Sequence, residues 1–205
     1  MLSKVKLTES EMREFAEVFA NYDYGFEEIG MVPLFPGYPD TGRLVDYLVA
    51  MIRTANEYDA VYATSENKEG IIILTDTTDP YPSGAMVKML WRMARALGFR
   101  NFGNIMKKFQ AGGASQEKTY RDRKDPFVQI ELLAVRKRYQ GQGFMRPLVE
   151  TAFEVARAKK LPVIVSTDAA LKKDKYAHLG MEHVNTRTLA EGSYMYDLVR
   201  PSSSN

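Results

Sequence analysis

The chain has 205 residues, of which 45% are hydrophobic and 26% charged, and its formal net charge is +2. This length supports one sizeable hydrophobic core, so we expect a single α/β domain. A net charge so near zero argues against nucleic acid or an anionic membrane as the principal partner, and no apolar run approaches the roughly 20 residues that span a bilayer. The first residues lead into a charged helix pattern instead of a signal peptide, so a cytoplasmic location is expected.

The cysteine and histidine content excludes several kinds of active site. The absence of cysteine excludes disulfides, thiolate nucleophiles and cysteine-bound metals. The two histidines, His178 and His183, have a spacing that fits no zinc motif, and the sequence contains no G-x-S-x-G elbow. We therefore expect neither a metal site nor a serine hydrolase.

The N-terminal part is predicted to be helical. Thr8 or Ser10 can cap a first helix and Thr41 can begin a second, since apolar residues follow each at the helical period. Two strands are expected at 58–64 and 70–76, where a polar turn separates two apolar runs. They should form an antiparallel hairpin.

A methionine-rich helix pattern follows the hairpin. We favour core packing for its apolar stripe over a flexible binding surface. The stripe consists of Met86, Met89, Leu90, Met93 and Leu97. After a shorter apolar helix, the polar segment 112–125 is expected to be an exposed connector.

The second half alternates strands and helices. A strand, a helix and a second strand in succession predict a parallel crossover, and two closing strands predict an antiparallel hairpin, so the sheet should be mixed. The expected elements are strands at 127–135, 162–167, 182–189 and 193–199, with helices at 143–159 and near 170–179.

The turn between the strand at 127–135 and the next helix has the pattern of a phosphate site. Gly141 and Gly143 allow the backbone to approach a ligand, and the first amides of a helix attract anions. Proline is tolerated only in the first turn of a helix, so Pro147 predicts that the helix begins near Gln142 or Gly143. An ordinary tight strand-to-helix connection is the alternative.

Cations surround this turn in the sequence. They would meet the phosphates of an anionic ligand, although a solvated run of charge is the alternative for each of them. The cations are Arg136, Lys137, Arg138 and Arg146, joined by Lys172, Lys173 and Lys175 from the later helix.

The spacing of the turn separates it from two nucleotide-binding motifs. No Gly-Lys-Ser or Gly-Lys-Thr ending is present, and the next glycine after Gly143 is Gly180, so neither a P-loop nor a Rossmann fingerprint fits. The turn resembles the Q/R-x-x-G-x-G/A signature of the GCN5-related N-acetyltransferases, which an apolar L-A-V run precedes. The matching residues are Gln140, Gly141, Gln142, Gly143, Phe144 and Met145, with Met145 in place of the usual Gly or Ala.

A second element extends the resemblance. Tyr176 and Gly180 match the family's Y-x-x-x-G-F element, with Met181 replacing Phe, and the strand at 194–200 resembles its closing strand. The resemblance covers residues 128–200 and implies an acyl-CoA N-acyltransferase fold with a mixed, mostly antiparallel central sheet flanked by helices. It divides a single domain over 1–200 into an acceptor side at 1–126 and an acetyl-CoA-binding half at 127–200, followed by a frayed tail at 201–205.

The resemblance also implies residue roles, with acetyl-CoA as the co-substrate and no metal. Tyr176 would donate a proton to the departing thiolate, because a phenol of pKa about 10 stays protonated where a thiol of pKa about 8.5 begins to ionise. A packed aromatic with a surface hydroxyl is the alternative. Residues expected to contact acetyl-CoA are Leu133, Ala134, Val135, Gln140, Gly141, Gln142, Gly143, Phe144, Met145, Arg146, Thr167 and Asp168.

Glu131 is the candidate base for the acceptor amine. It shares a strand face with Gln129 and Leu133, and this face can point toward the acceptor side. A solvent-facing glutamate is the alternative, and water can also carry the proton away. The loop at 22–40 combines aromatic and acidic residues that suit a cationic amine, although such loops also seal cores.

These features predict an N-acetyltransferase that transfers acetyl directly to a primary amine in a ternary complex. The alternatives are a catalytically silent acyl-CoA-binding sensor and a transferase for another acyl group. We expect a small-molecule acceptor in preference to a protein, and a monomer or homodimer.

Overall fold

The computed structural model of the protein describes residues 2–24, 41–189 and 194–202. Most of the loop expected at 22–40, and the end of the predicted tail, lie outside these residues. Seven strands form one sheet in the order β1-β2-β3-β4-β5-β7-β6, and every neighbouring pair is antiparallel except β4 with β5. The strands are β1 Ser3–Lys4, β2 Val61–Ala63, β3 Gly70–Asp76, β4 Val128–Val135, β5 Val163–Thr167, β6 Glu182–Thr188 and β7 Tyr194–Arg200.

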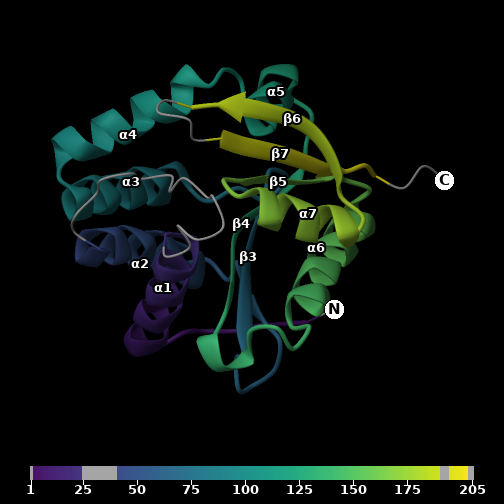
Figure 1. The fold of residues 1–205 in the computed structure, drawn as a ribbon, viewed down its shortest axis with the longest axis horizontal. Coiled ribbons are helices and arrows are strands. Elements are labelled where there is room, and N and C mark those ends of the chain that lie inside the picture. The colour runs from purple at the N-terminus through teal and green to yellow at the C-terminus, as the bar shows by residue number, and fades with distance from the viewer. Residues whose placement is uncertain (1, 25–40, 190–193, 203–205) are drawn as a thin grey trace.

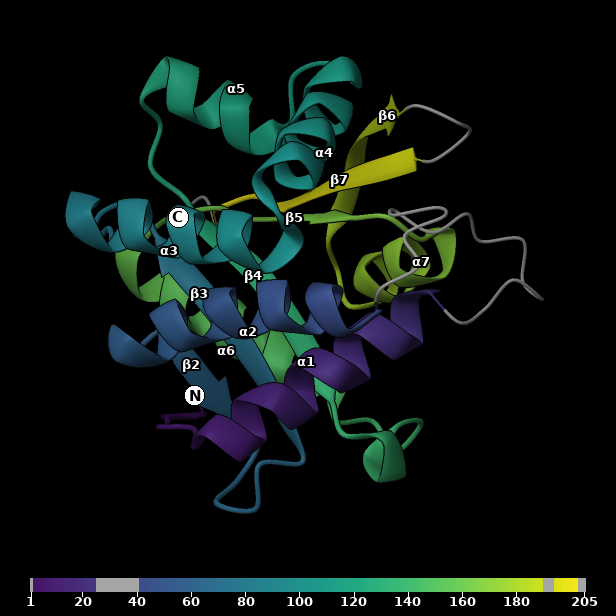
Figure 2. The same ribbon diagram turned by 90° about the vertical axis from the view of Figure 1, so that its left-hand side faces the viewer.

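Helices cover both faces of this sheet (Figures 1 and 2). α1 and α2 lie on one face of β3 and β4, and α6 lies on the other, as the two groups of buried side chains confirm. The helices are α1 Glu9–Tyr24, α2 Thr41–Glu57, α3 Ser83–Leu97, α4 Phe99–Ala111, α5 Gln116–Arg123, α6 Met145–Lys159 and α7 Ala170–His178. The predicted fold class, a mixed and mostly antiparallel sheet flanked by helices, is confirmed.

The start of α1 is fixed by a reciprocal cap. The amide of Glu11 donates to the Thr8 hydroxyl oxygen (3.3 Å), and the amide of Thr8 donates to the Glu11 carboxylate (2.8 Å). Thr8, and not Ser10, is therefore the capping residue, and such a cap contributes about 1 kcal/mol. The predicted start of α2 at Thr41 is confirmed.

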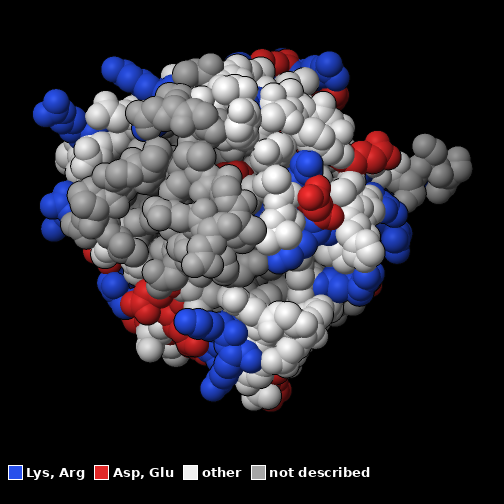
Figure 3. Space-filling model, in the orientation of Figure 1, with Lys and Arg blue, Asp and Glu red and all other residues white. Residues whose placement is uncertain are grey.

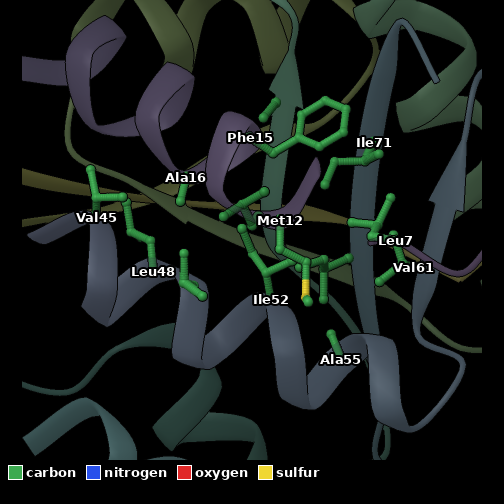
Figure 4. Close-up of a cluster of buried hydrophobic side chains, with 14 of the residues drawn as sticks. Leu7, Met12, Phe15, Ala16, Val45, Leu48, Ile52, Ala55, Val61 and Ile71 are labelled. Atoms are coloured by element: carbon green, nitrogen blue, oxygen red, sulfur yellow. The ribbon is translucent and has the colours of Figure 1, made fainter. Parts of the chain in front are cut away.

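Two apolar clusters hold the helices to the sheet. In the first, Phe15 of α1 and Ile52 of α2 are fully buried with Ile71 of β3 (Figure 4). In the second, α6 and α7 pack on the opposite face, with Leu148 and Val149 fully buried. Burying each large apolar side chain contributes on the order of 1.5–3 kcal/mol, so both faces of the central strands are rigidly supported.

The segment predicted to be an exposed connector, 112–125, has no buried residue, but it contains a helix, α5, that was not predicted. The Ser115 hydroxyl accepts a hydrogen bond from the amide of Lys118, which caps the helix. Two ion pairs four residues apart, Lys118 with Asp122 and Glu117 with Arg121, support it. A helix that is polar on all sides has no apolar stripe from which periodicity could reveal it.

The core interpretation of the methionine-rich stripe is confirmed for only part of it. Met93 and Leu97 are buried, whereas Met86 and Leu90 on α3 are 37% and 44% exposed. Only one face of α3 is buried, so a stripe wider than that face reaches the surface. None of the described helices is long and apolar enough to cross a bilayer.

Candidate active site

The centre of the sheet opens where its two parallel strands part. β4 and β5 pair only over Val128–Ile130 and Val163–Val165. Beyond Ile130 the strands separate, and Figure 1 shows β5 running at a wide angle to β4. The remaining part of β4 therefore turns one edge of its backbone toward an opening between the two strands.

A β-bulge in β4 lies at the same point. Ile73 of β3 pairs with Leu132 and the next residue, Leu74, pairs with Ile130, so Glu131 is an extra residue in the ladder. A bulge bends its strand and changes the direction of the extra side chain. Glu131 is thus placed where β4 leaves β5.

A cavity of about 660 Å³ fills the opening. Its walls come from β4, β5, α6 and α7, with Val18 and Phe19 of α1 on one side. Every candidate site residue except Gln142 lines it; those that do are Glu131, Leu133, Ala134, Val135, Gln140, Gly141, Gly143, Phe144, Met145, Arg146, Thr167, Asp168 and Tyr176. The side chain of Gln142 is exposed and donates to the carbonyl of Arg138 (2.9 Å).

The turn before α6 needs glycine for its backbone conformation. Gly141 and Gly143 have φ values of 78° and 87°, and a Cβ atom added at either would meet nothing within 4 Å. The left-handed φ of Gly143 also explains why α6 begins at Met145, slightly later than predicted, with Pro147 in its first turn as expected. Gln140 donates to the Val135 carbonyl (3.0 Å) and so joins the turn to the end of β4.

Met145 stands where the resembling family has a small residue, and its side chain is half-buried. It packs against the apolar cluster of α6 and α7 while also lining the cavity. Residues 143–146 at the start of α6 all line the cavity.

Arg136 does not contribute to the cations expected around the turn. Its guanidinium pairs with Glu14 (3.2 Å) and lies over the Phe15 ring, 5.2 Å from the centroid, with the side chain only 11% exposed. Arg146 lies at the cavity and approaches Glu150 at 3.8 Å. Further basic side chains lie over α6 and α7 in Figure 3.

Glu131 is half-buried at the cavity, with polar neighbours. The Thr75 hydroxyl donates to one carboxylate oxygen (2.7 Å), and the Gln129 amide donates to the other (3.3 Å). Burial raises the pKa of Glu131 to about 7, and the nearby Glu117 adds to the rise, while the Thr75 hydrogen bond opposes it. The group can therefore exchange a proton near neutral pH.

Tyr176 and its neighbours on α7 also line the cavity. Tyr176 is buried, being 6% exposed, and packs in the cluster of α6 and α7. Asp168 pairs with Lys172 (3.2 Å), whose ammonium lies 5.1 Å from the centroid of the Phe19 ring. This contact brings α7 against α1 at the side of the cavity.

Two residues of the site escaped the sequence analysis. Ser166 lines the cavity directly, and Thr75 donates to Glu131. The alternation of the strand already placed Gln129 and Glu131 on one face. The hydrogen bond from Thr75 to Glu131 depends on the register of β3 against β4, which the sequence does not reveal. Among the described residues, no group of three or more His, Asp or Glu side chains could hold a metal ion.

A sheet opened between parallel strands, with a glycine turn and a helix start beside the opening, defines an acyltransferase type of fold and site. The model of the acetyltransferase (GNAT) family matches residues 77–178, about half of the chain. The chain belongs to the GNAT superfamily, and it is an acetyltransferase. Members of this family use acetyl-CoA as co-substrate. No curated protein matches the sequence.

Solved structures of acetyltransferases share the fold at low sequence identity. An arylalkylamine N-acetyltransferase from the yellow fever mosquito superimposes with a TM-score of 0.60 at 12% identity, over 95% of this chain and 83% of that one. An N-acetyltransferase from Staphylococcus aureus gives 0.54 at 13% identity, over 98% and 100%. An agmatine N-acetyltransferase gives 0.54 at 14% identity, over 98% of each chain.

Proposed function

We propose that the protein transfers the acetyl group of acetyl-CoA directly to a primary amine within a ternary complex. The observation that carries this proposal is a single cavity, open between β4 and β5, that both Glu131 and Tyr176 line. A base and an acid on different walls of one cavity suit a reaction that removes a proton at one atom and delivers one to another.

The donor would lie along β4 and over the turn before α6. We assign the unpaired edge of Leu133–Val135 to the pantetheine arm, and Thr167 and Asp168 to its far side. The amides and positive helix end at Gln140–Arg146 suit the pyrophosphate, since a helix N-terminus favours anions. Residues 127–200 would thus supply the donor half of the domain and residues 1–126 the acceptor side.

Glu131 and Tyr176 would manage the protons. As the amine nitrogen bonds to the acyl carbon, Glu131 accepts the proton that this nitrogen loses. As the carbon–sulfur bond breaks, Tyr176 donates its phenolic proton to the thiolate. The products are an amide and CoA thiol, and proton exchange with solvent restores both side chains.

The acceptor is proposed to be a small molecule. Two of the structures that share the fold bear names of enzymes for arylalkylamines and agmatine, both small amines. The location in the cytoplasm stays a prediction from the sequence.

Two measurements test this function. Acetyl-CoA and CoA should each raise the melting temperature, because a ligand that binds only the folded state stabilises it. Thiol release from acetyl-CoA should then depend on an added amine. No shift with either ligand would contradict donor binding, whereas a shift without thiol release for any amine would identify a sensor. If propionyl-CoA outperforms acetyl-CoA, the acyl assignment is wrong.

A further inference from the structure

A row of polar side chains crosses the sheet where β4 and β5 part. Ile130 and Val165 form the last pair of the parallel ladder, so the next positions along each strand are Glu131 and Ser166. Both Glu131 and Ser166 line the cavity. Asp197 of β7 pairs with Ser166 on the other side of β5 and continues the row.

The far end of the row is a buried ion pair. Arg187 and Asp197 are 6% and 0% exposed, and two guanidinium nitrogens each lie 3.0 Å from a different carboxylate oxygen. Asn185 also donates to Asp197 (3.3 Å). Burying such a pair gives little net stability compared with an apolar replacement, so stability alone does not account for its presence.

This ion pair determines what Ser166 can do. The Ser166 hydroxyl donates its single proton to Asp197, with 2.6 Å between the oxygens. A hydroxyl has one proton and two lone pairs, so Ser166 can present only lone pairs to the cavity that it lines. Ser166 therefore accepts hydrogen bonds from a ligand and does not donate them.

A further acceptor lies beside Glu131. The amide nitrogen of Gln129 donates to Glu131, and the amide oxygen of Gln129 is buried with no hydrogen-bond partner among the described residues. We call Glu131 and Ser166 the split end of the cavity; both line it and offer a hydrogen-bond acceptor. Gln129 pairs with Ile164 in the ladder just before the strands separate.

The cations that line the cavity are Arg146, within residues 140–146, which we call the cradle end, and Lys172 and Lys175 of α7. Lys172 is held by Asp168, which follows β5 (3.2 Å). Near the split end, Arg187 is held by Asp197 and Arg121 by Glu117 (2.8 Å). The segments outside the described residues contain no lysine or arginine. Lys172, Arg187 and Arg121 are thus each held by a carboxylate of the protein, so an anionic acceptor would have to compete with that carboxylate for a counter-charge.

We propose that the amine of the acceptor binds between Glu131 and Ser166, and that the acceptors are amines without a carboxylate beside the nitrogen. Asp197 and Arg187 fix Ser166 as a hydrogen-bond acceptor. This inference rests on the proposed function. Ser166 is then a substrate-binding residue, and Asp197 and Arg187 are positioning residues that act through it.

Matched acceptors test the substrate class. Tyramine and tyrosine differ only in the carboxylate, as do agmatine and arginine, and each of these molecules has a single nucleophilic primary amine. At least one amine should exceed its amino acid by about 100-fold in kcat/KM, because the carboxylate would be desolvated without a partner. Equal use of amine and amino acid in both pairs would overturn the substrate class.

The role of Ser166 is tested with the amine that has the higher kcat/KM. Ser166→Ala should raise the KM for the amine about 10-fold, as expected for one lost hydrogen bond to a charged group, and leave the KM for acetyl-CoA unchanged. Ser166→Thr retains the hydroxyl and should restore the amine KM. Ser65→Ala also removes a hydroxyl that donates to a carboxylate, but on the distant β2–β3 turn, and should change neither value.

The possible failures differ from one another. Ser166→Ala retains the bond between Asp197 and Arg187, so the test does not depend on breaking a buried ion pair. An unchanged amine KM in Ser166→Ala would overturn the proposal for Ser166 while leaving acetyl transfer intact. Acetyl-CoA binding without acetylation of any amine would overturn the proposed function and this inference together.

Discussion

The two ends of the cavity are built in different ways. The cradle end consists of one continuous stretch, residues 140–146, which includes the cation Arg146. The split end is assembled from separate strands, with Glu131 on β4 and Ser166 on β5, and Ser166 is held by Asp197 on β7. One end suits an anion and the other a cation, so the cavity distinguishes its two proposed ligands by charge.

This difference also explains which features the sequence could predict. The glycine spacing and Pro147 are local signals, and they placed the turn and the first helical turn of α6 close to their positions. The partners of Ser166 depend on β7 lying between β5 and β6, which no local pattern encodes. Arg136 was misjudged for the same reason, because its partner Glu14 is far away in the sequence.

The largest expected effect is at the split end. Glu131→Gln should lower kcat about 100- to 1,000-fold, since general-base catalysis typically contributes that much, and leave the affinity for acetyl-CoA unchanged. The wild-type kcat should rise with pH around an apparent pKa near 7, and this rise should disappear in the variant. Steady-state rates between pH 5.5 and 9 measure both effects. An unchanged kcat would remove Glu131 from the chemistry.

The same variant makes a prediction about stability. The folded pKa of Glu131, about 7, lies above its ordinary value of 4.5, so the folded state binds the proton more tightly than the unfolded state. The free energy of unfolding of the wild type therefore falls as pH rises from about 4.5 to 7. Glu131→Gln should raise the melting temperature at pH 8 and have little effect at pH 4.

Tyr176→Phe should have the next largest effect. Loss of the proposed proton donor should slow turnover about 10- to 100-fold, with the affinity for acetyl-CoA largely intact. A leaving thiol of lower pKa needs less help from an acid, so an acyl donor of that kind should recover part of the rate. Equal losses with both donors would argue that Tyr176 has only a packing role.

At the cradle end, Gly143→Ala should weaken donor binding and spare the chemistry. A non-glycine residue at a φ of 87° costs about 1–3 kcal/mol, so the KM for acetyl-CoA should rise about 10-fold while the amine KM stays constant. Gly103→Ala in α4 also meets nothing within 4 Å, has no positive φ and should change neither constant. A rise in the amine KM alone would reverse the assignment of the two ends.

The smallest expected effect comes from removing the hydrogen bond that Thr75 donates to Glu131. The Thr75 hydroxyl stabilises the charged form of Glu131, so Thr75→Val should raise the Glu131 pKa further above its ordinary range. The kcat profile should shift toward higher pH with a similar plateau. A shift toward lower pH would contradict this role for Thr75.

The central claim is direct transfer between two ligands bound together. Initial rates over a matrix of acetyl-CoA and amine concentrations test it most directly. We predict double-reciprocal lines that intersect, because both substrates must be bound before either product leaves. Parallel lines would indicate that an acetylated side chain forms before the amine binds, and would contradict the account.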